Sequence, residues 1–257
     1  FPSTRQLMDI SDKHALRDNP VLRDDIKAAE DIYGTNLGAL KGKTVTQKGI
    51  TVDGKVTGVP ITIKQKYKNV TMCIDIMFVN KIPFLLTISR GLHFGTVENL
   101  INRRVPTICT ALHKVLAQYK RRGYRVTAIH ADPEFEPLQA VIGKLQFNFC
   151  AQNEHVPEIE RFIRTVKDRA RSGYHSLPFK RIPRLIIIRL IANSVFWLNA
   201  FPHHDGASST LSPRFLLTGK QLEFTKHVRA EFGSYAQTHE QHSNNMDART
   251  IGAICLG

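Results

Sequence analysis

Three acidic residues have sequence contexts that predict partly buried carboxylates on separate elements of one domain. Asp75 lies within a β-rich run that is apolar on both faces, so an ionised carboxylate there needs a hydrogen-bonding or metal partner. Asp132 closes another β-rich segment, at the end of a strand where ligands usually bind in α/β sheets. Glu160 borders the apolar stripe of an amphipathic helix. Together they could hold two Mg²⁺ or Mn²⁺ ions, which activate a water or a 3′-hydroxyl in phosphodiester chemistry.

Each acid also has an ordinary structural explanation. Asp75 could pair with a buried arginine, because buried charges are generally paired. Asp132 could simply begin a turn before the proline that follows it. Glu160 could form a solvent-exposed ion pair with Arg164, which would stabilise the helix by only about 0.2–0.5 kcal/mol.

A row of cations continues from Glu160 along the same helix. Arg164, Lys167 and Arg171 follow it at spacings that place them on one side of a helix. No second acid stands in that row. We therefore expect the row to hold the phosphates of a nucleic acid next to the three carboxylates.

The whole chain is basic, with 36 Lys and Arg against 22 Asp and Glu in 257 residues and a formal net charge of +14. This surplus indicates nucleic acid or an acidic membrane surface as a partner, although a solvated basic surface would also explain it. Part of it lies in a glycine- and lysine-rich stretch, residues 34–69, which we expect to be an extended arm. Lys64 and Lys66 are DNA-binding candidates there, and a plain linker is an equally good explanation.

The four cysteines are widely spaced and form no Cys-x-x-Cys pair. We therefore predict no zinc site and no disulfide framework, which fits a reducing, intracellular compartment. The longest apolar run, residues 185–201, is interrupted by Arg189, Asn193 and Asn199. It predicts a buried helix and no membrane span.

Alternating strand and helix patterns predict an α/β fold in which a mixed sheet is flanked by helices. Strands are expected at residues 70–79, 83–89, 125–131 and 147–150, with one more after the second, and helices at 99–122, 137–145, 157–172 and 184–201. The chain divides into a helical segment with a basic arm (1–69), a catalytic core (70–220) and the truncated start of a β-rich domain (221–257).

The segment from Asp75 to Phe215 resembles the integrase catalytic core of retroelements, particularly copia-type LTR retrotransposons. The resemblance is carried by Cys73-Ile-Asp-Ile-Met-Phe-Val, His130-Ala-Asp-Pro-Glu-Phe, Pro157-Glu-Ile-Glu-Arg-Phe-Ile-Arg-Thr-Val-Lys and Ser212-Pro-Arg-Phe-Leu-Leu-Thr-Gly. It implies an RNase H-like fold with a mixed five-stranded sheet, and a D,D,E triad of Asp75, Asp132 and Glu160 that binds two Mg²⁺ or Mn²⁺ ions. It also implies 3′-end processing and strand transfer of element DNA into a target DNA. We further expect a homo-oligomer that acts in the nucleus.

The sequence departs from this family in two places. Only 28 residues separate Asp132 from Glu160, fewer than is usual in the family, and the shortening falls in the loop before the glutamate helix. Glu154 in that loop is a second candidate for the third acid. The family's N-terminal zinc module is missing, because no cysteine precedes Cys73. We expect the chain to be a piece of a longer polyprotein.

Three alternatives to a DNA-joining enzyme remain open. The first is an RNase H-like nuclease that hydrolyses without strand transfer. The second is a catalytically inactive remnant of a retroelement that only binds DNA. The third is a basic structural protein, in which a buried Asp75 would have no purpose.

Overall fold

The computed structural model describes residues 3–13, 15, 17–38, 41, 58–143, 145–150, 156–179, 181–240 and 246–257. The chain forms two compact units, one of Phe1–Val52 with Ser234–Cys255 and one of Asp53–Gly233 with Leu256–Gly257. The three-part division at residues 69/70 and 220/221 stays a prediction. Most of the expected basic arm, residues 42–57, lies outside the described residues.

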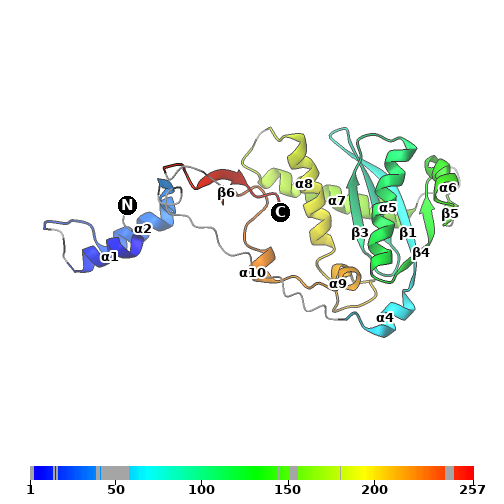
Figure 1. Cartoon of the computed structure of the whole chain (residues 1–257), viewed down its shortest axis with the longest axis horizontal. Helices are drawn as coiled ribbons and strands as arrows, with labels where there is room; N and C mark the ends of the chain where they lie inside the picture. The colour runs from blue at the N-terminus through cyan, green and yellow to red at the C-terminus, as the bar shows by residue number, and fades with distance from the viewer. Residues whose placement is uncertain are drawn as a thin grey trace. The chain divides into compact units, whose positions relative to one another are not determined.

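A five-stranded mixed sheet forms the centre of the larger unit (Figure 1). Its strands are β1 (Asn69–Val79), β2 (Ile82–Ser89), β3 (Gly95–Asn99), β4 (Arg125–Ala131) and β5 (Gln146–Phe149). They lie in the order β3-β2-β1-β4-β5, with the first three antiparallel and β4 and β5 parallel to β1. This is the RNase H-like fold that the sequence predicted, and β1 is its central strand.

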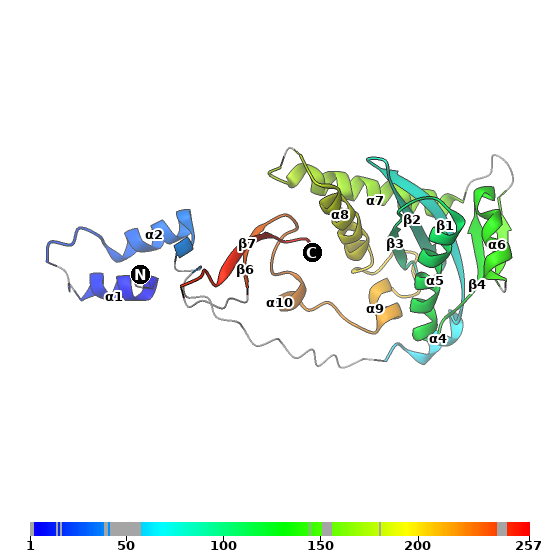
Figure 2. The same cartoon turned by 45° about the horizontal axis from the view of Figure 1, so that its top comes forward.

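Helices cover both faces of the sheet, with α5 on one side and α7 and α8 on the other (Figure 2). The helices of this unit are α4 (Ile61–Lys66), α5 (Val105–Arg121), α6 (Glu136–Ile142), α7 (Pro157–Ser176), α8 (Arg184–Leu198), α9 (Pro213–Thr218) and α10 (Phe224–His227), with a 3₁₀ turn, η1, at Pro133–Phe135. Side chains alternate along β1, so Met72 and Ile74 face the α5 core while Cys73 and Met77 face the α7 core.

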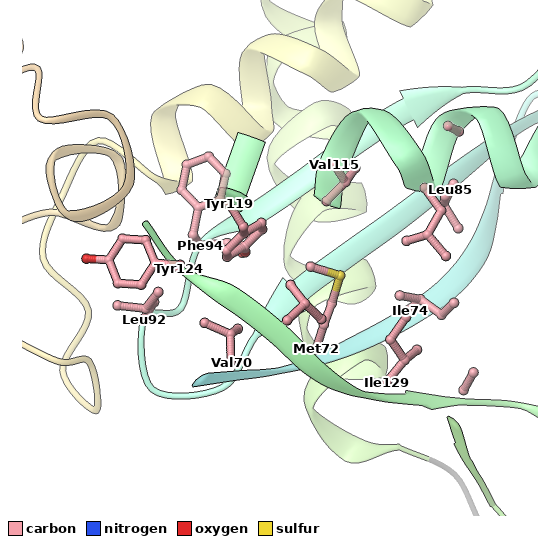
Figure 3. Close-up of a cluster of buried hydrophobic side chains, with 14 of the residues drawn as sticks. Val70, Met72, Ile74, Leu85, Leu92, Phe94, Val115, Tyr119, Tyr124 and Ile129 are labelled. Carbon is pink, nitrogen blue, oxygen red and sulfur yellow. The ribbon is translucent and has the colours of Figure 1, made fainter. Parts of the chain in front are cut away.

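The α5-side core is closed by large apolar and aromatic side chains (Figure 3). Tyr119 of α5 is fully buried, and its hydroxyl donates to the Phe94 carbonyl at 3.3 Å. Tyr124, which follows α5, donates in the same way to the Leu216 carbonyl at 3.1 Å. Both rings therefore bury apolar surface without leaving a hydroxyl unpaired.

The predicted apolar stripe of α7 faces the sheet. Ile159, Phe162, Val166 and Ala170 are all buried in the core that α7 shares with α8. Gly95 allows this approach, because a Cβ atom there would lie 2.2 Å from the Phe162 ring. A side chain at residue 95 would therefore force the Phe162 ring of α7 to move.

Several element boundaries differ from the sequence prediction. Residues 95–99 form β3 because they pair with β2, so α5 begins at Val105 and not at Asn99. Helix α7 continues to Ser176, four residues beyond its expected end. Residues 58–69 are not a purely extended arm, since they include the short helix α4 and the buried Val59.

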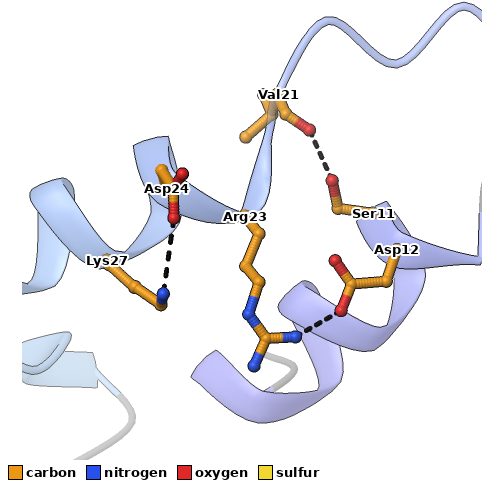
Figure 4. Close-up of polar contacts among 6 residues, drawn as sticks. All are labelled: Ser11, Asp12, Val21, Arg23, Asp24 and Lys27. Atoms are coloured by element: carbon orange, nitrogen blue, oxygen red, sulfur yellow. Dashed lines mark hydrogen bonds and ion pairs between the residues drawn. The ribbon is translucent and has the colours of Figure 1, made fainter.

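The smaller unit contains α1 (Thr4–Asp12), α2 (Arg23–Tyr33) and an antiparallel pair of strands, β6 (Tyr235–His239) and β7 (Thr250–Ile254). Polar contacts join the two helices (Figure 4). The Ser11 hydroxyl donates to the Val21 carbonyl at 2.6 Å, and Arg23 forms an ion pair with Asp12.

No helix in the described part of the chain combines the length and the apolar character needed to cross a membrane. Helix α8, which contains most of the longest apolar run, has 15 residues and six buried side chains.

The side chain of Asn199, just after α8, completes the outer edge of the sheet. Its carboxamide oxygen accepts from the Gly95 N–H at 2.9 Å, and its NH₂ group donates to the Gly95 carbonyl at 2.7 Å. Asn199 is only 6% exposed, so water cannot readily replace its carboxamide as the hydrogen-bond partner of the Gly95 N–H and carbonyl. The pair ties the end of α8 to β3.

Replacing Asn199 by alanine should therefore lower the free energy of unfolding by about 2–4 kcal/mol, because two buried backbone groups lose their partners. Chemical denaturation monitored by circular dichroism measures this. Asn69→Ala, at an exposed position at the start of β1, is the matched control and should change stability by less than about 0.5 kcal/mol. Equal effects of the two substitutions would contradict the role given to Asn199.

Candidate active site

Asp75 of β1 and Asp132, the residue just after β4, occupy matching positions along two neighbouring parallel strands. Cys73 of β1 pairs with His130 of β4, and each acid lies two residues further along its own strand direction. Residues two apart in a strand face the same side, and Cys73 belongs to the α7-side core. Opposite Asp75 on β2 stands Leu86, which belongs to the same core. The strand register therefore brings the Asp75 carboxyl to the α7 face of the sheet, and Asp132, just beyond the end of β4, acts electrostatically on it.

Asp75 is half-buried, and its environment opposes ionisation. Burial and, to a smaller extent, the carboxylates of Asp132, Glu134 and Glu160 together raise the pKa of Asp75 from its usual 3.8 to about 6. One stabilising contact acts in the opposite direction, since the Asp75 Oδ1 accepts from the Ile76 N–H at 2.6 Å. All three predicted acids thus share one electrostatic environment, centred on the middle strand.

Glu134 is a fourth acid at this site, and the sequence analysis did not select it. It lies in η1, two residues after Asp132, where it acts electrostatically on Asp75 and forms an ion pair with Arg103. The Arg103 guanidinium also lies 5.5 Å from the centre of the Phe78 ring. The closeness of Glu134 to Asp132 in the sequence could have indicated this fourth acid. The direction of the Glu134 side chain, however, depends on the η1 turn.

Glu160 is exposed near the start of α7, and the neighbouring Glu158 anchors that helix. A Glu158 oxygen, Oε1, lies 2.7 Å from the Arg90 guanidinium, which extends from the end of β2. The other oxygen, Oε2, is buried and has no hydrogen-bond partner among the described residues. The sequence analysis gave Glu158 no role. In the structure, its ion pair with Arg90 links the end of β2 to the end of α7 that bears Glu160.

Cys73 lies close to this ion pair, but it is not a nucleophile. Burial raises the pKa of the Cys73 thiol to about 11, although the Arg90 cation opposes the shift. A thiol with this pKa stays protonated near neutral pH, so it lacks the thiolate that covalent catalysis requires.

The cation row of α7 lies alongside a pocket toward the turn between β1 and β2. Lys167 and Arg171 line this pocket of about 550 Å³, together with Asn80. Arg171 also pairs with Asp168 at 3.0 Å. The spacing of the row suggested that no acid other than Glu160 is near it, and this ion pair shows that one is. Arg164, closer to Glu160, is exposed.

Lys64 and Lys66 are not near the three acids. They belong to α4, which precedes β1, whereas Asp75 lies six residues into that strand. At the rise of a β-strand this separates them by about 20 Å. Glu154, the alternative third acid, lies outside the described residues.

The oxygen-rich donor set suits Mg²⁺ or Mn²⁺, and a cation would relieve the repulsion that raises the pKa of Asp75. By donor chemistry, Asp75, Asp132 and Glu160 therefore fit a divalent metal. Among the residues that the structure describes, however, no three His, Cys, Asp or Glu side chains converge as closely as metal ligands do. Coordination would require these side chains to move together, as catalytic groups often do when a site is filled.

Comparison with known proteins finds similarity to solved structures. No protein-family model matches the chain, and no curated protein matches it. Among solved structures, the chain is similar to the catalytic core domain of BIV integrase. The likeness covers 57% of this chain and 92% of that one, at 14% sequence identity and a TM-score of 0.42.

The raised pKa of Asp75 predicts how stability depends on pH in metal-free buffer. Between about pH 4 and pH 6 the folded protein keeps a proton that the unfolded chain has released, so the free energy of unfolding should fall as pH rises through this window. Asp75→Asn should remove that part of the pH dependence and should be more stable than the parent at pH 7. Urea denaturation in EDTA at several pH values measures both effects.

Two controls show whether the effect belongs to the acid cluster. Asp168→Asn, an exposed acid on the same side of the sheet, should keep the pH dependence of the parent. Mg²⁺ should raise the melting temperature of the parent at pH 7 more than that of Asp75→Asn. If the parent and Asp75→Asn have the same pH dependence, the electrostatic environment described for Asp75 is wrong.

Proposed function

We propose that this chain is an integrase-type polynucleotidyl transferase that processes DNA 3′ ends and transfers them into a target DNA. The observation that supports the proposal is the strand register, which aligns Asp75 with Asp132, the residue just after β4, while Asp132 and Glu160 both act electrostatically on Asp75. A nuclease or transferase of this kind needs several carboxylates around one phosphodiester. A basic structural protein would have no use for an acid half-buried in the central strand.

The proposed roles follow from the positions of the side chains. Asp75, Asp132 and Glu160 would hold Mg²⁺ or Mn²⁺, which when bound would activate a water or 3′-hydroxyl and stabilise the leaving oxygen. Arg164 and Lys167 continue along α7 from Glu160, where they would bind phosphates next to the reacting one. Cations beside the acids also keep the DNA backbone from being repelled by them.

The partners follow from the same assignment. We propose that the substrates are an element DNA end and a target DNA, that the chain acts as a homo-oligomer, and that it works in the nucleus. A copia-type retrotransposon origin is supported by the sequence motifs around Asp75, Asp132 and Glu160. The net charge of +14 supports a nucleic-acid partner.

One observation favours a second candidate, a DNA-binding remnant without catalytic activity. The acids share an electrostatic environment, yet no three potential metal ligands converge within the described residues. If the side chains cannot close around metal ions, DNA binding would remain and the chemistry would be lost. The two candidates differ in their products and not in their affinity for DNA.

Asp132→Asn decides between them. We expect the parent protein, incubated with a blunt DNA duplex and supercoiled plasmid in Mg²⁺ or Mn²⁺, to give joined products. Asp132→Asn should lower their rate by about 100-fold or more, because the site loses a metal-binding charge. Gel analysis of end-labelled DNA measures joining and simple hydrolysis in the same reaction.

Glu136→Gln is the matched control, because Glu136 is an exposed acid nearby on α6 and is not among the main groups that shift the pKa of Asp75. It should leave the rate unchanged. Joined products at equal rates from the parent and Asp132→Asn would contradict the triad. Hydrolysis without joining would instead identify a nuclease, and binding without either product would identify the inactive remnant.

A further inference from the structure

Lysines and arginines from two distant parts of the sequence gather at the end of the sheet where β1 and β4 begin. We call this group the second basic surface. Its members are Lys64, Lys66, Lys68, Lys120, Arg121, Arg122 and Arg125.

Backbone pairing and packing hold these segments together. The Arg125 N–H donates to the Lys68 carbonyl at 2.7 Å, and Asn69 pairs with Arg125 in the sheet. Tyr67, next to α4, packs on the same core as Tyr119 at the end of α5. The seven cations are thus fixed to one rigid part of the fold, although more than fifty residues separate the two segments.

Nothing described in the structure neutralises this surface. Residues 58–68 and 113–130 contain no Asp or Glu. None of the seven cations forms an ion pair with a described residue, whereas Lys114, earlier on α5, lies 3.7 Å from Glu98. Six of the seven are exposed, and Arg122 is half-buried. Such uncompensated positive charge attracts a polyanion.

The second basic surface is separate from the cations beside the acids. Lys167 and Arg171 lie near the β1–β2 turn, at the far end of β1, on the α7 face. The second basic surface lies at the near end of β1 and belongs to the α5 side, where α4 and α5 pack. The eleven residues of β1 span about 35 Å, and the sheet itself stands between the two groups.

We propose that the second basic surface binds the phosphate backbone of a second DNA duplex, different from the duplex that reacts at the acids of the same chain. This inference rests on the proposed function, because a joining reaction involves two DNA molecules. Duplex DNA carries its phosphates at a regular spacing, so cations spread over several elements of one rigid surface can bind it without reading its sequence.

The test measures binding in EDTA, so that it does not depend on catalysis. The triple substitution Lys64→Gln, Lys66→Gln and Lys68→Gln should weaken binding of a long duplex by at least about tenfold at moderate salt. It should also reduce the slope of log affinity against log salt concentration by about 3, since each phosphate contact contributes about 0.9. Fluorescence anisotropy at several salt concentrations gives both values.

The matched control removes the same charge elsewhere. Arg181, Arg184 and Arg189 are exposed around the start of α8, and replacing all three by Gln should change the slope by less than about 1. Circular dichroism checks that both triple variants fold. Equal losses in the two variants would mean that only net charge matters, which would overturn the proposal.

Stoichiometry distinguishes a second duplex from one long duplex that reaches both surfaces. With a duplex of about ten base pairs, one helical turn, the parent should bind two copies per chain. The Lys64, Lys66 and Lys68 variant should bind one, and so should a variant with Arg164→Gln and Lys167→Gln. A single copy bound by the parent would overturn the proposal. The proposal would also be overturned if the Lys64, Lys66 and Lys68 variant lost affinity for single-stranded RNA but not for duplex DNA.

These outcomes are independent of the chemistry at the acids. If the parent binds two duplexes but joins none, the second basic surface stands and the proposed enzymatic function falls. If the parent joins DNA while the triple variant binds like the parent, the proposed function stands and this inference falls.

Discussion

Asp75 sits in the central strand, where burial and three neighbouring carboxyl groups all oppose its ionisation. The rest of the larger unit is arranged around this unfavourable charge. Parallel pairing of β1 with β4 places Asp132 beside it, and α7 brings Glu160 to the same face. A divalent cation would attract all of these carboxylates and offset their mutual repulsion. The arrangement that is unfavourable without metal is therefore suited to binding metal.

The position of Glu160 depends on contacts far from it in the sequence. Arg90 at the end of β2 pairs with Glu158, and Gly95 of β3 leaves room for the ring of Phe162. Asn199 then fixes the end of α8 to the backbone of residue 95. These contacts hold α7 and α8 against the antiparallel half of the sheet. The third acid is therefore positioned by packing and edge pairing, while the first two are positioned by strand register.

The positive charge of the chain is divided by the fold. One group of cations follows Glu160 along α7, and another surrounds the start of β1 and β4 on the other side of the sheet. Between them lies the acid cluster. The net charge of +14 does not reveal this division, because it adds together positive and negative charges that lie in separate places in the structure.

The sequence by itself determined the sheet with its flanking helices, the central place of β1, the buried stripe of α7 and the three candidate acids, because these depend on local alternation and helical period. It misplaced the start of α5, since residues 95–99 become a strand only by pairing with β2. Only the tertiary structure showed that Glu134 acts on Asp75, that Glu158 anchors α7, and that Lys64 and Lys66 lie away from the acids. Each of these depends on which distant segments meet, and the spacing of residues along one chain does not contain that information.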